Sequence, residues 1–226
     1  SGGATRLSLW HGIPLKKIGF DIYGKKDSFK DRVKTFFYKV FYPDDYVIPD
    51  YFLSTRSAEI SAIFERAYPA KSYLHSVYPR VEHFIYGQKQ QQEFLQAITT
   101  PKEKELIAFM GTFDHVLIYM PTFRDHSKDD EEMRSKNVFD LDILNKILKE
   151  TNSLLLVKFH VSMQERFNKE ANYSNIHFVD PAMDVYVVLP YTTALITDYS
   201  SVFFDYMLLN KPILFYNFDM EAYNKN

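Results

Sequence analysis

The sequence predicts an α/β fold in which parallel β-sheets are covered by helices on both faces. Three observations support this prediction. From residue 114 onward, short apolar runs alternate with amphipathic segments, as they do in βαβ units. Turn-forming and polar residues follow the ends of these runs. The composition, with 46% apolar and 25% charged residues among 226, is typical of a globular protein with one large or two small domains.

The N-terminal part begins with an expected strand over residues 6–10 that leads into His11-Gly12-Ile13-Pro14-Leu15. Gly12 and Pro14 favour a turn, so His11 is expected at the C-terminal end of a strand. Because this strand has an interior pattern but nothing precedes it, we expect its domain to be incomplete at the N-terminus. Helices are predicted over residues 28–41 and 56–68, the second with Thr55 as N-cap, and strands over residues 51–54 and 76–80.

A shift in composition predicts the domain boundary near residues 86–108, which gives domains 1–90 and 91–226. Residues 87–92 are polar and residues 102–105 are charged. Beyond them the pattern becomes regular, and the C-terminus is expected to be truncated as well. Strands are predicted over residues 116–119, 153–159, 176–179, 194–197 and 212–216, and helices over residues 139–150, 163–171, 184–189 and 202–209.

The chain is organised around residues 194–209, a predicted strand, tight turn and helix. Ser200 and Ser201 stand directly before the helix, where unpaired backbone N–H groups attract phosphate. Serine is also a common N-cap, so a capped helix without a ligand remains the simpler alternative. Asp205 follows one helical turn later and is a candidate acceptor for ligand hydroxyl groups.

The C-terminal ends of parallel strands meet at one edge of a sheet, so three loops are expected to converge there. They hold residues 121–124, 158–160 and 200–201. Their cationic and hydroxyl side chains suit a diphosphate better than a hard metal ion, and we expect neither a metal nor a cofactor. His160 is either a neutral hydrogen-bonding group or an imidazolium on phosphate. The candidate side chains are Thr122, Arg124, Lys158, His160, Ser200 and Ser201.

His11 has a side chain suited to removing a proton from an acceptor hydroxyl group at neutral pH. A structural histidine in a loop is the alternative. A formal net charge of −2 gives no sign of a nucleic-acid partner, and the lack of cysteine excludes disulfides and thiolate metal sites. No apolar run approaches the ~18 to 20 residues that span a bilayer.

Six motifs, in order along the chain, resemble those of the CDP-glycerol glycerophosphotransferase family, the teichoic acid and capsule polymerases and primases of bacteria. The similarity covers nearly the whole chain. The motifs are residues 10–19, which begin with Trp10-His11-Gly12, then Tyr78-Pro79-Arg80, residues 119–125, Lys158-Phe159-His160, residues 197–205 and residues 211–216.

The resemblance implies a GT-B fold of two Rossmann-like domains, with the N-terminal, acceptor-side domain incomplete and CDP-glycerol bound by the C-terminal one. It implies transfer of glycerol phosphate to the terminal hydroxyl of a lipid-linked polyol-phosphate chain, with release of CMP, at the cytoplasmic face of the bacterial membrane. His11 resembles the general base and, with His160, is an expected catalytic residue. The expected substrate contacts are His11, Gly12, Ile13, Pro14, Leu15, Arg80, Pro121, Thr122, Arg124, Lys158, Phe159, His160, Ser200, Ser201 and Asp205.

The sequence departs from the family pattern after two motifs. Val161 stands where the family usually has proline, and Val81-Glu82 where it tends to Asn-Asp, which loosens the assignment of Arg80. Two other functions remain open. One is transfer from another donor, by a CDP-ribitol ribitolphosphotransferase or a GT-B glycosyltransferase that uses a nucleotide sugar. The other is a polymer-binding module that has the scaffold but no turnover.

Overall fold

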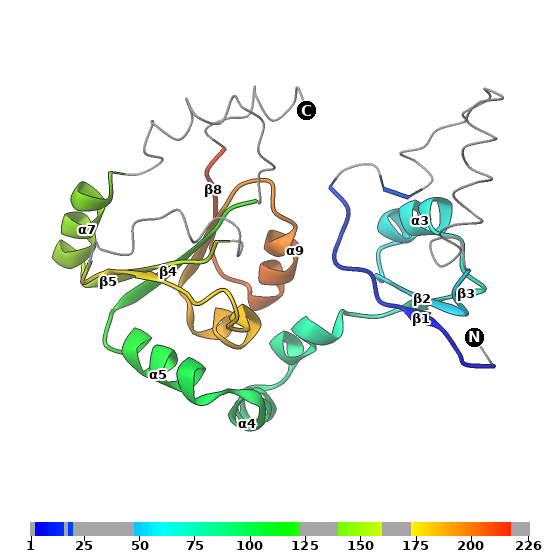
Figure 1. Ribbon diagram of the computed structural model, residues 1–226, viewed down its shortest axis with the longest axis horizontal. Helices are drawn as coiled ribbons and strands as arrows, with labels where there is room; N and C mark the ends of the chain where they lie inside the picture. The colour runs from blue at the N-terminus through cyan, green and yellow to red at the C-terminus, as the bar shows by residue number, and fades with distance from the viewer. Residues whose placement is uncertain (1–2, 16–17, 20–47, 123–139, 160–172, 218–226) are drawn as a thin grey trace. The chain divides into compact units, whose positions relative to one another are not determined.

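The computed structural model describes residues 3–15, 18–19, 48–122, 140–159 and 173–217 (Figure 1). Two compact units divide between Glu82 and His83. The boundary expected from the sequence, at residues 90 and 91, falls inside α4 (Gln88–Ile98), which belongs to the second unit. The expected helices over residues 28–41 and 163–171, and the side chains of Arg124 and His160, lie outside the described residues.

Unit 1 contains a parallel sheet of strands in the order β1-β2-β3. The strands are β1 (Leu7–Ser8), β2 (Tyr51–Ser54) and β3 (Ser72–His75), and α3 (Ala58–Ala67) follows β2. Phe64 of α3 packs against Phe52 of β2, with ring centroids 5.1 Å apart. Both side chains are buried, so this pair joins the helix to the sheet.

Two details of unit 1 correct the sequence prediction. The N-cap of α3 is Ser57, whose hydroxyl accepts a hydrogen bond from the Ile60 N–H at 3.4 Å, whereas Thr55 was expected. The third strand is residues 72–75 rather than 76–80, and a 3₁₀ helix, η2 (Pro79–Ile85), follows it. Proline has no N–H to donate to a sheet, which favours the helical start over a strand at that position.

Gly19 permits a close approach of its backbone to the end of α3. Its φ is +50°, and an added Cβ would lie 2.3 Å from the carbonyl oxygen of Ala67. We expect Gly19→Ala to lower the free energy of unfolding by about 2 kcal/mol or more, from the left-handed backbone and the clash together. Chemical denaturation measures this change. Gly111→Ala is the matched control, because the nearest atom to its added Cβ is 3.4 Å away; equal effects of the two substitutions would contradict the prediction.

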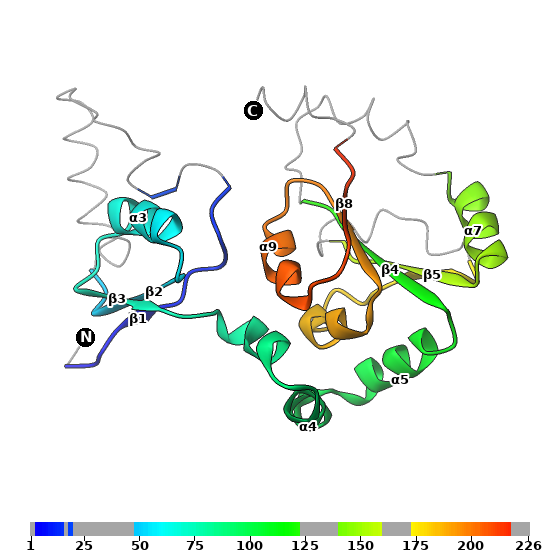
Figure 2. The ribbon, with the colours of Figure 1, turned by 180° about the vertical axis from the view of Figure 1, so that it is seen from behind.

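Unit 2 is built on a five-stranded, entirely parallel sheet in the order β6-β5-β4-β7-β8 (Figure 2). This arrangement confirms the predicted α/β class. The first strand of this sheet along the chain is the central one, β4. The next two strands, β5 and β6, lie on one side of it, and the last two, β7 and β8, lie on the other side. The strands are β4 (His115–Met120), β5 (Ser153–Val157), β6 (Ile176–Phe178), β7 (Ala194–Thr197) and β8 (Ile213–Phe215).

The helices of unit 2 are short, and several have clear caps. The Thr100 hydroxyl accepts a hydrogen bond from the Glu103 N–H in a capping box, and Asp140 caps the next helix described. The predicted helix over residues 202–209 is divided into α9 and a 3₁₀ turn, and that over residues 184–189 is two 3₁₀ turns. The elements are α5 (Pro101–Met110), α7 (Leu141–Glu150), η3 (Val185–Val187), η4 (Leu189–Tyr191), α9 (Val202–Tyr206) and η5 (Met207–Leu209).

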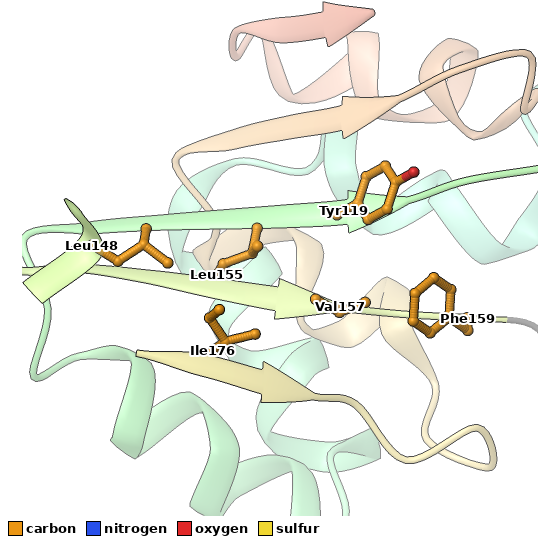
Figure 3. Close-up of a cluster of buried hydrophobic side chains, with 6 residues drawn as sticks. All are labelled: Tyr119, Leu148, Leu155, Val157, Phe159 and Ile176. Carbon is orange, nitrogen blue, oxygen red and sulfur yellow. The ribbon is translucent and has the colours of Figure 1, made fainter. Parts of the chain in front are cut away.

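An apolar cluster joins α7 to the sheet in unit 2. Figure 3 shows Leu148 of α7 close to Leu155 of β5. All five residues of β5 are buried, as expected of a strand inside a doubly covered parallel sheet. α7 and α9 lie on opposite sides of this unit (Figures 1 and 2). The buried cluster consists of Tyr119, Leu148, Leu155, Val157, Phe159 and Ile176.

Candidate functional site

The carboxyl ends of β4, β5 and β7 lie side by side in unit 2. Tyr119 is in register with Val157, and Met120 with Thr197. The loops that follow these strands therefore leave the sheet at one edge. The strand order reverses between β4 and β7, and such a switch point is where open α/β sheets bind ligands.

Asp198 joins two of these loops at the switch point. Its Oδ1 accepts hydrogen bonds from the Thr122 N–H at 2.7 Å, the Thr122 hydroxyl at 2.6 Å and the Tyr199 N–H at 2.6 Å. Only 2% of Asp198 is exposed. The carboxylate thus fixes the course of the chain after β4 and β7. Asp198 was not among the site residues predicted from the sequence, although its position directly after a buried strand was an available signal.

Ser200 and Ser201 follow Asp198 and are half-buried. Ser201 is the residue before α9, but its side chain makes no capping hydrogen bond. The Ser200 hydroxyl is 3.5 Å from the Val202 N–H, which is at the limit of a hydrogen bond. A side-chain cap by Ser201, the simpler explanation for the serine pair, is therefore not what the structure shows. α9 itself has only five residues.

Asp205 on α9 is buried, with 6% of its surface exposed. The Tyr186 hydroxyl donates to its Oδ2 at 2.7 Å. The carbonyl oxygen of Tyr186 lies 3.1 Å from Nε2 of His83, and this contact holds Tyr186 in place. Burial lowers the pKa of His83. Asp205 already accepts a hydroxyl group in the way we expect it to accept one from a ligand. Tyr186 was not predicted from the sequence, because nothing in its local pattern indicates a contact 19 residues away.

Lys158 was expected to contact phosphate, and the structure places its ammonium group on backbone oxygens. Its Nζ donates to the carbonyl oxygens of Asp180, Pro181 and Met183 at 2.8, 2.9 and 3.1 Å. Burial lowers the pKa of Lys158, while the charges of Asp180 and Asp184 act in the opposite direction. All three N–H donors of the ammonium group are thus engaged in holding the loop after β6 against the end of β5.

Phe159, another expected substrate contact, belongs to the buried apolar cluster of Figure 3 and is 8% exposed. A ligand would therefore meet mainly its backbone. Pro121 and Thr122 are partly exposed. Unit 2 thus brings six of the expected contacts to one edge of the sheet: Pro121, Thr122, Lys158, Phe159, Ser200 and Ser201. A seventh, Asp205, lies on α9.

Unit 1 holds the remaining expected residues that the structure describes. His11 is exposed, and its ring centroid lies 4.2 Å from that of Trp10. Trp10 and Gly12 both have positive φ, of 53° and 150°, so the chain turns sharply on either side of His11.

Tyr78 connects the His11 loop to Arg80. Its hydroxyl donates to the Gly12 carbonyl oxygen at 3.4 Å, and the Arg80 guanidinium lies 4.7 Å from its ring centroid. Gly12 is buried, Ile13 and Pro14 are partly exposed and Leu15 is exposed. Unit 1 thereby groups Arg80 with the segment from His11 to Leu15.

Within the part of the chain that the structure describes, no group of three His, Cys, Asp or Glu side chains is arranged to hold a metal ion. The described helices also include none of the length and apolar character that crossing a membrane requires.

Comparison with known proteins identifies several relatives. The chain is 29% identical over 237 residues to a teichoic acid glycerol-phosphate transferase of Staphylococcus aureus, covering 97% of this chain and 54% of the relative. It is 31% identical to a teichoic acid poly(glycerol phosphate) polymerase of Bacillus spizizenii, covering 98% and 54%. A teichoic acid ribitol-phosphate polymerase of S. aureus is 28% identical. The chain spans about half the length of the first two relatives.

A solved structure of the wall teichoic acid polymerase TagF, from a variant soaked with CDPG, matches 98% of this chain. The TM-score is 0.67 at 27% identity, and the match covers 51% of the TagF chain. This likeness confirms the predicted GT-B-like fold for the matched part. A family model described as CDP-glycerol:poly(glycerophosphate) glycerophosphotransferase matches residues 1–226, the whole of the sequence. The chain therefore belongs to the CDP-glycerol:poly(glycerophosphate) glycerophosphotransferase family.

Proposed function

We propose that the protein transfers glycerol phosphate from CDP-glycerol to the terminal hydroxyl group of a polyol-phosphate chain, such as teichoic acid or a capsule polymer, and releases CMP. The observation that carries this proposal is the switch point between β4 and β7, where Asp198 fixes two loops and the serine pair follows. It occurs in a chain whose whole length matches this family. The TagF variant soaked with CDPG supports the choice of donor.

The proposed reaction joins the acceptor oxygen to the phosphorus of glycerol phosphate. The bond that breaks links this phosphorus to the oxygen shared with CMP, so CMP leaves with the bonding electron pair. The proton of the acceptor hydroxyl moves to His11, whose exposed imidazole suits the role of base. Positioning of both substrates and neutralisation of phosphate charge supply the rest of the rate enhancement.

We assign the donor to the unit that contains β4 to β8, within the proposed domain of residues 91–226, and the acceptor to residues 1–90. Asp205 would accept a hydroxyl group of the donor, and the backbone around Ser200 and Ser201 would contact its phosphates. Arg124 and His160 stay as proposed phosphate contacts, with His160 also proposed as catalytic. A lipid-linked acceptor would place the protein on the cytoplasmic membrane surface.

A ribitol-phosphate transferase is the second candidate, because a ribitol-phosphate polymerase of S. aureus is almost as similar as the glycerol-phosphate enzymes. The two donors differ only in the polyol beyond the diphosphate. A polymer-binding module would have no donor site at all. The three functions therefore differ in which nucleotide ligands the protein binds.

Calorimetric titration with CDP-glycerol, CDP-ribitol, CMP and a UDP-sugar tests the proposal, followed by an assay of CMP release in the presence of a glycerol-phosphate oligomer. We expect selective binding of CDP-glycerol and release of CMP. Tighter binding of CDP-ribitol would transfer the assignment to the ribitol donor. A protein that binds none of these nucleotides would contradict the proposed function and favour the polymer-binding module.

A further inference from the structure

A cluster of polar side chains in unit 1 lies at the carboxyl edge of the β1-β2-β3 sheet, and the proposed reaction has so far given it no role. His75 is the last residue of β3, in register with Ser54 at the end of β2, and its side chain is exposed. Ser61 of α3 contacts both strand ends: its hydroxyl is 2.8 Å from that of Ser54 and 3.2 Å from Nδ1 of His75. Two strand ends and the helix after β2 thus hold one imidazole ring.

The contacts of His75 determine which ring nitrogen carries the proton in the neutral form. Nδ1 lies 3.0 Å from the carbonyl oxygen of Thr55, which can only accept a hydrogen bond. Nδ1 is therefore the donor, and Nε2 has the lone pair. Among the described residues no side chain or backbone group bonds Nε2. The strand edge thus presents a fixed acceptor for the O–H group of a ligand.

Arg56 adds a positive charge at the same edge, two residues beyond the end of β2. Its side chain is exposed and forms no ion pair with the residues that the structure describes. A nearby carboxylate, that of Glu59, accepts a hydrogen bond from the Ser57 hydroxyl at 2.7 Å instead. A guanidinium group in this setting is a suitable partner for a phosphate group.

We propose that Arg56 and His75 form a binding subsite for the polyol-phosphate acceptor, with a phosphodiester at Arg56 and a polyol hydroxyl at Nε2 of His75. Neighbouring strands are about 4.8 Å apart, so one polyol-phosphate unit can contact the ends of both β2 and β3. A simple phosphate would use only the arginine and an uncharged polyol only the histidine. The two side chains together select a ligand that carries both groups. The inference rests on the proposed function, because it takes the acceptor class from it.

The single tryptophan of the chain provides a reporter for binding at this edge. Trp10 follows β1, the strand next to β2, and its ring lies 4.4 Å from that of Tyr68. Titration with a glycerol-phosphate oligomer, followed by tryptophan fluorescence, gives a dissociation constant without need for donor or turnover. Free glycerol and inorganic phosphate are titrated in the same way to separate the two halves of the ligand.

Three substitutions test the subsite. His75→Asn keeps a donor to the Thr55 carbonyl oxygen but lacks Nε2, and we expect about fivefold weaker binding of the oligomer. Arg56→Gln is expected to weaken binding about tenfold and to remove most of its dependence on salt. Lys104→Gln, at an exposed cation on α5, is the control and should leave the dissociation constant unchanged. Thermal melting of each variant confirms that it is folded.

The outcomes separate this subsite from the proposed function. If Arg56→Gln and His75→Asn bind the oligomer as tightly as the original protein, the subsite is wrong, whatever the donor results. A protein that does not bind the oligomer also overturns the subsite. CDP-glycerol binding and CMP release are measured on the same variants. If the variants bind both CDP-glycerol and the oligomer as the original protein does, the subsite alone is refuted. If the original protein binds neither CDP-glycerol nor the oligomer, the proposed function is refuted as well.

Discussion

Substitution of His11 by alanine is expected to lower the rate of CMP release by about 10²- to 10⁴-fold, the usual contribution of a general base. The imidazole is exposed and stands in a turn between two residues of positive φ, so its loss leaves no cavity in the core. We therefore expect the melting temperature to stay within about 1 °C of the original. CDP-glycerol affinity should also change little, because the proposed role of His11 is proton removal.

The assay compares CMP release, melting temperature and CDP-glycerol affinity for the two proteins. His115→Ala is the matched control. His115 is also exposed, but it is the first residue of β4, at the end of the strand away from the candidate site. It should retain full turnover. A His11→Ala protein that melts far below the original would favour the structural alternative for this residue. Full turnover by a folded His11→Ala protein would exclude it as the base.

Substitution of Asp198 by alanine is expected to lower the free energy of unfolding by about 3 to 5 kcal/mol and to abolish donor binding. The change leaves the Thr122 N–H, the Thr122 hydroxyl and the Tyr199 N–H without their shared acceptor. Each buried donor left unsatisfied costs about 1 to 3 kcal/mol, reduced where water or a relaxed loop replaces the carboxylate. For a chain of this size the melting temperature should fall by about 10 °C.

Thermal and chemical denaturation measure the loss, and calorimetry measures the donor affinity. Asp198→Asn keeps an oxygen that can accept the same bonds, so it should cost less than half as much. Asp114→Ala, at an exposed position before β4, is the control and should change stability by less than about 0.5 kcal/mol. If Asp198→Ala and Asp114→Ala unfold at the same denaturant concentration, the loops are not held by this carboxylate.

Local patterns were enough to predict the strands of unit 2. β4, β5 and β7 are apolar runs bounded by turns, and each strand begins and ends close to its predicted limits. Helix type and length were harder to predict. The run after Ser201 has the composition of one helix, yet it forms five α-helical residues and then a 3₁₀ turn. α4 was not predicted, because it begins with a run of polar residues and buries only Leu95.

At the candidate site, too, local sequence predicted some features and not others. Motif order was enough to identify the family and to place Thr122, Lys158 and Ser200 after strands that end together. The partners of these side chains come from distant parts of the chain, so they could not be predicted from local sequence. Lys158 meets carbonyl oxygens more than 20 residues away, and the Asp198 carboxylate meets Thr122 from 76 residues away.

The sequence by itself determined the α/β class, the parallel strands and the family, because strand periodicity, turn residues and ordered motifs are local properties of the chain. Only the tertiary structure decided which polar groups are engaged with one another. Asp198 emerged as the carboxylate that fixes the switch point, Tyr186 as the partner of Asp205, and His75 as a ring with one nitrogen held by the backbone. The physical reason is that hydrogen bonds between loops depend on strand order and register, which bring together residues that are far apart in sequence.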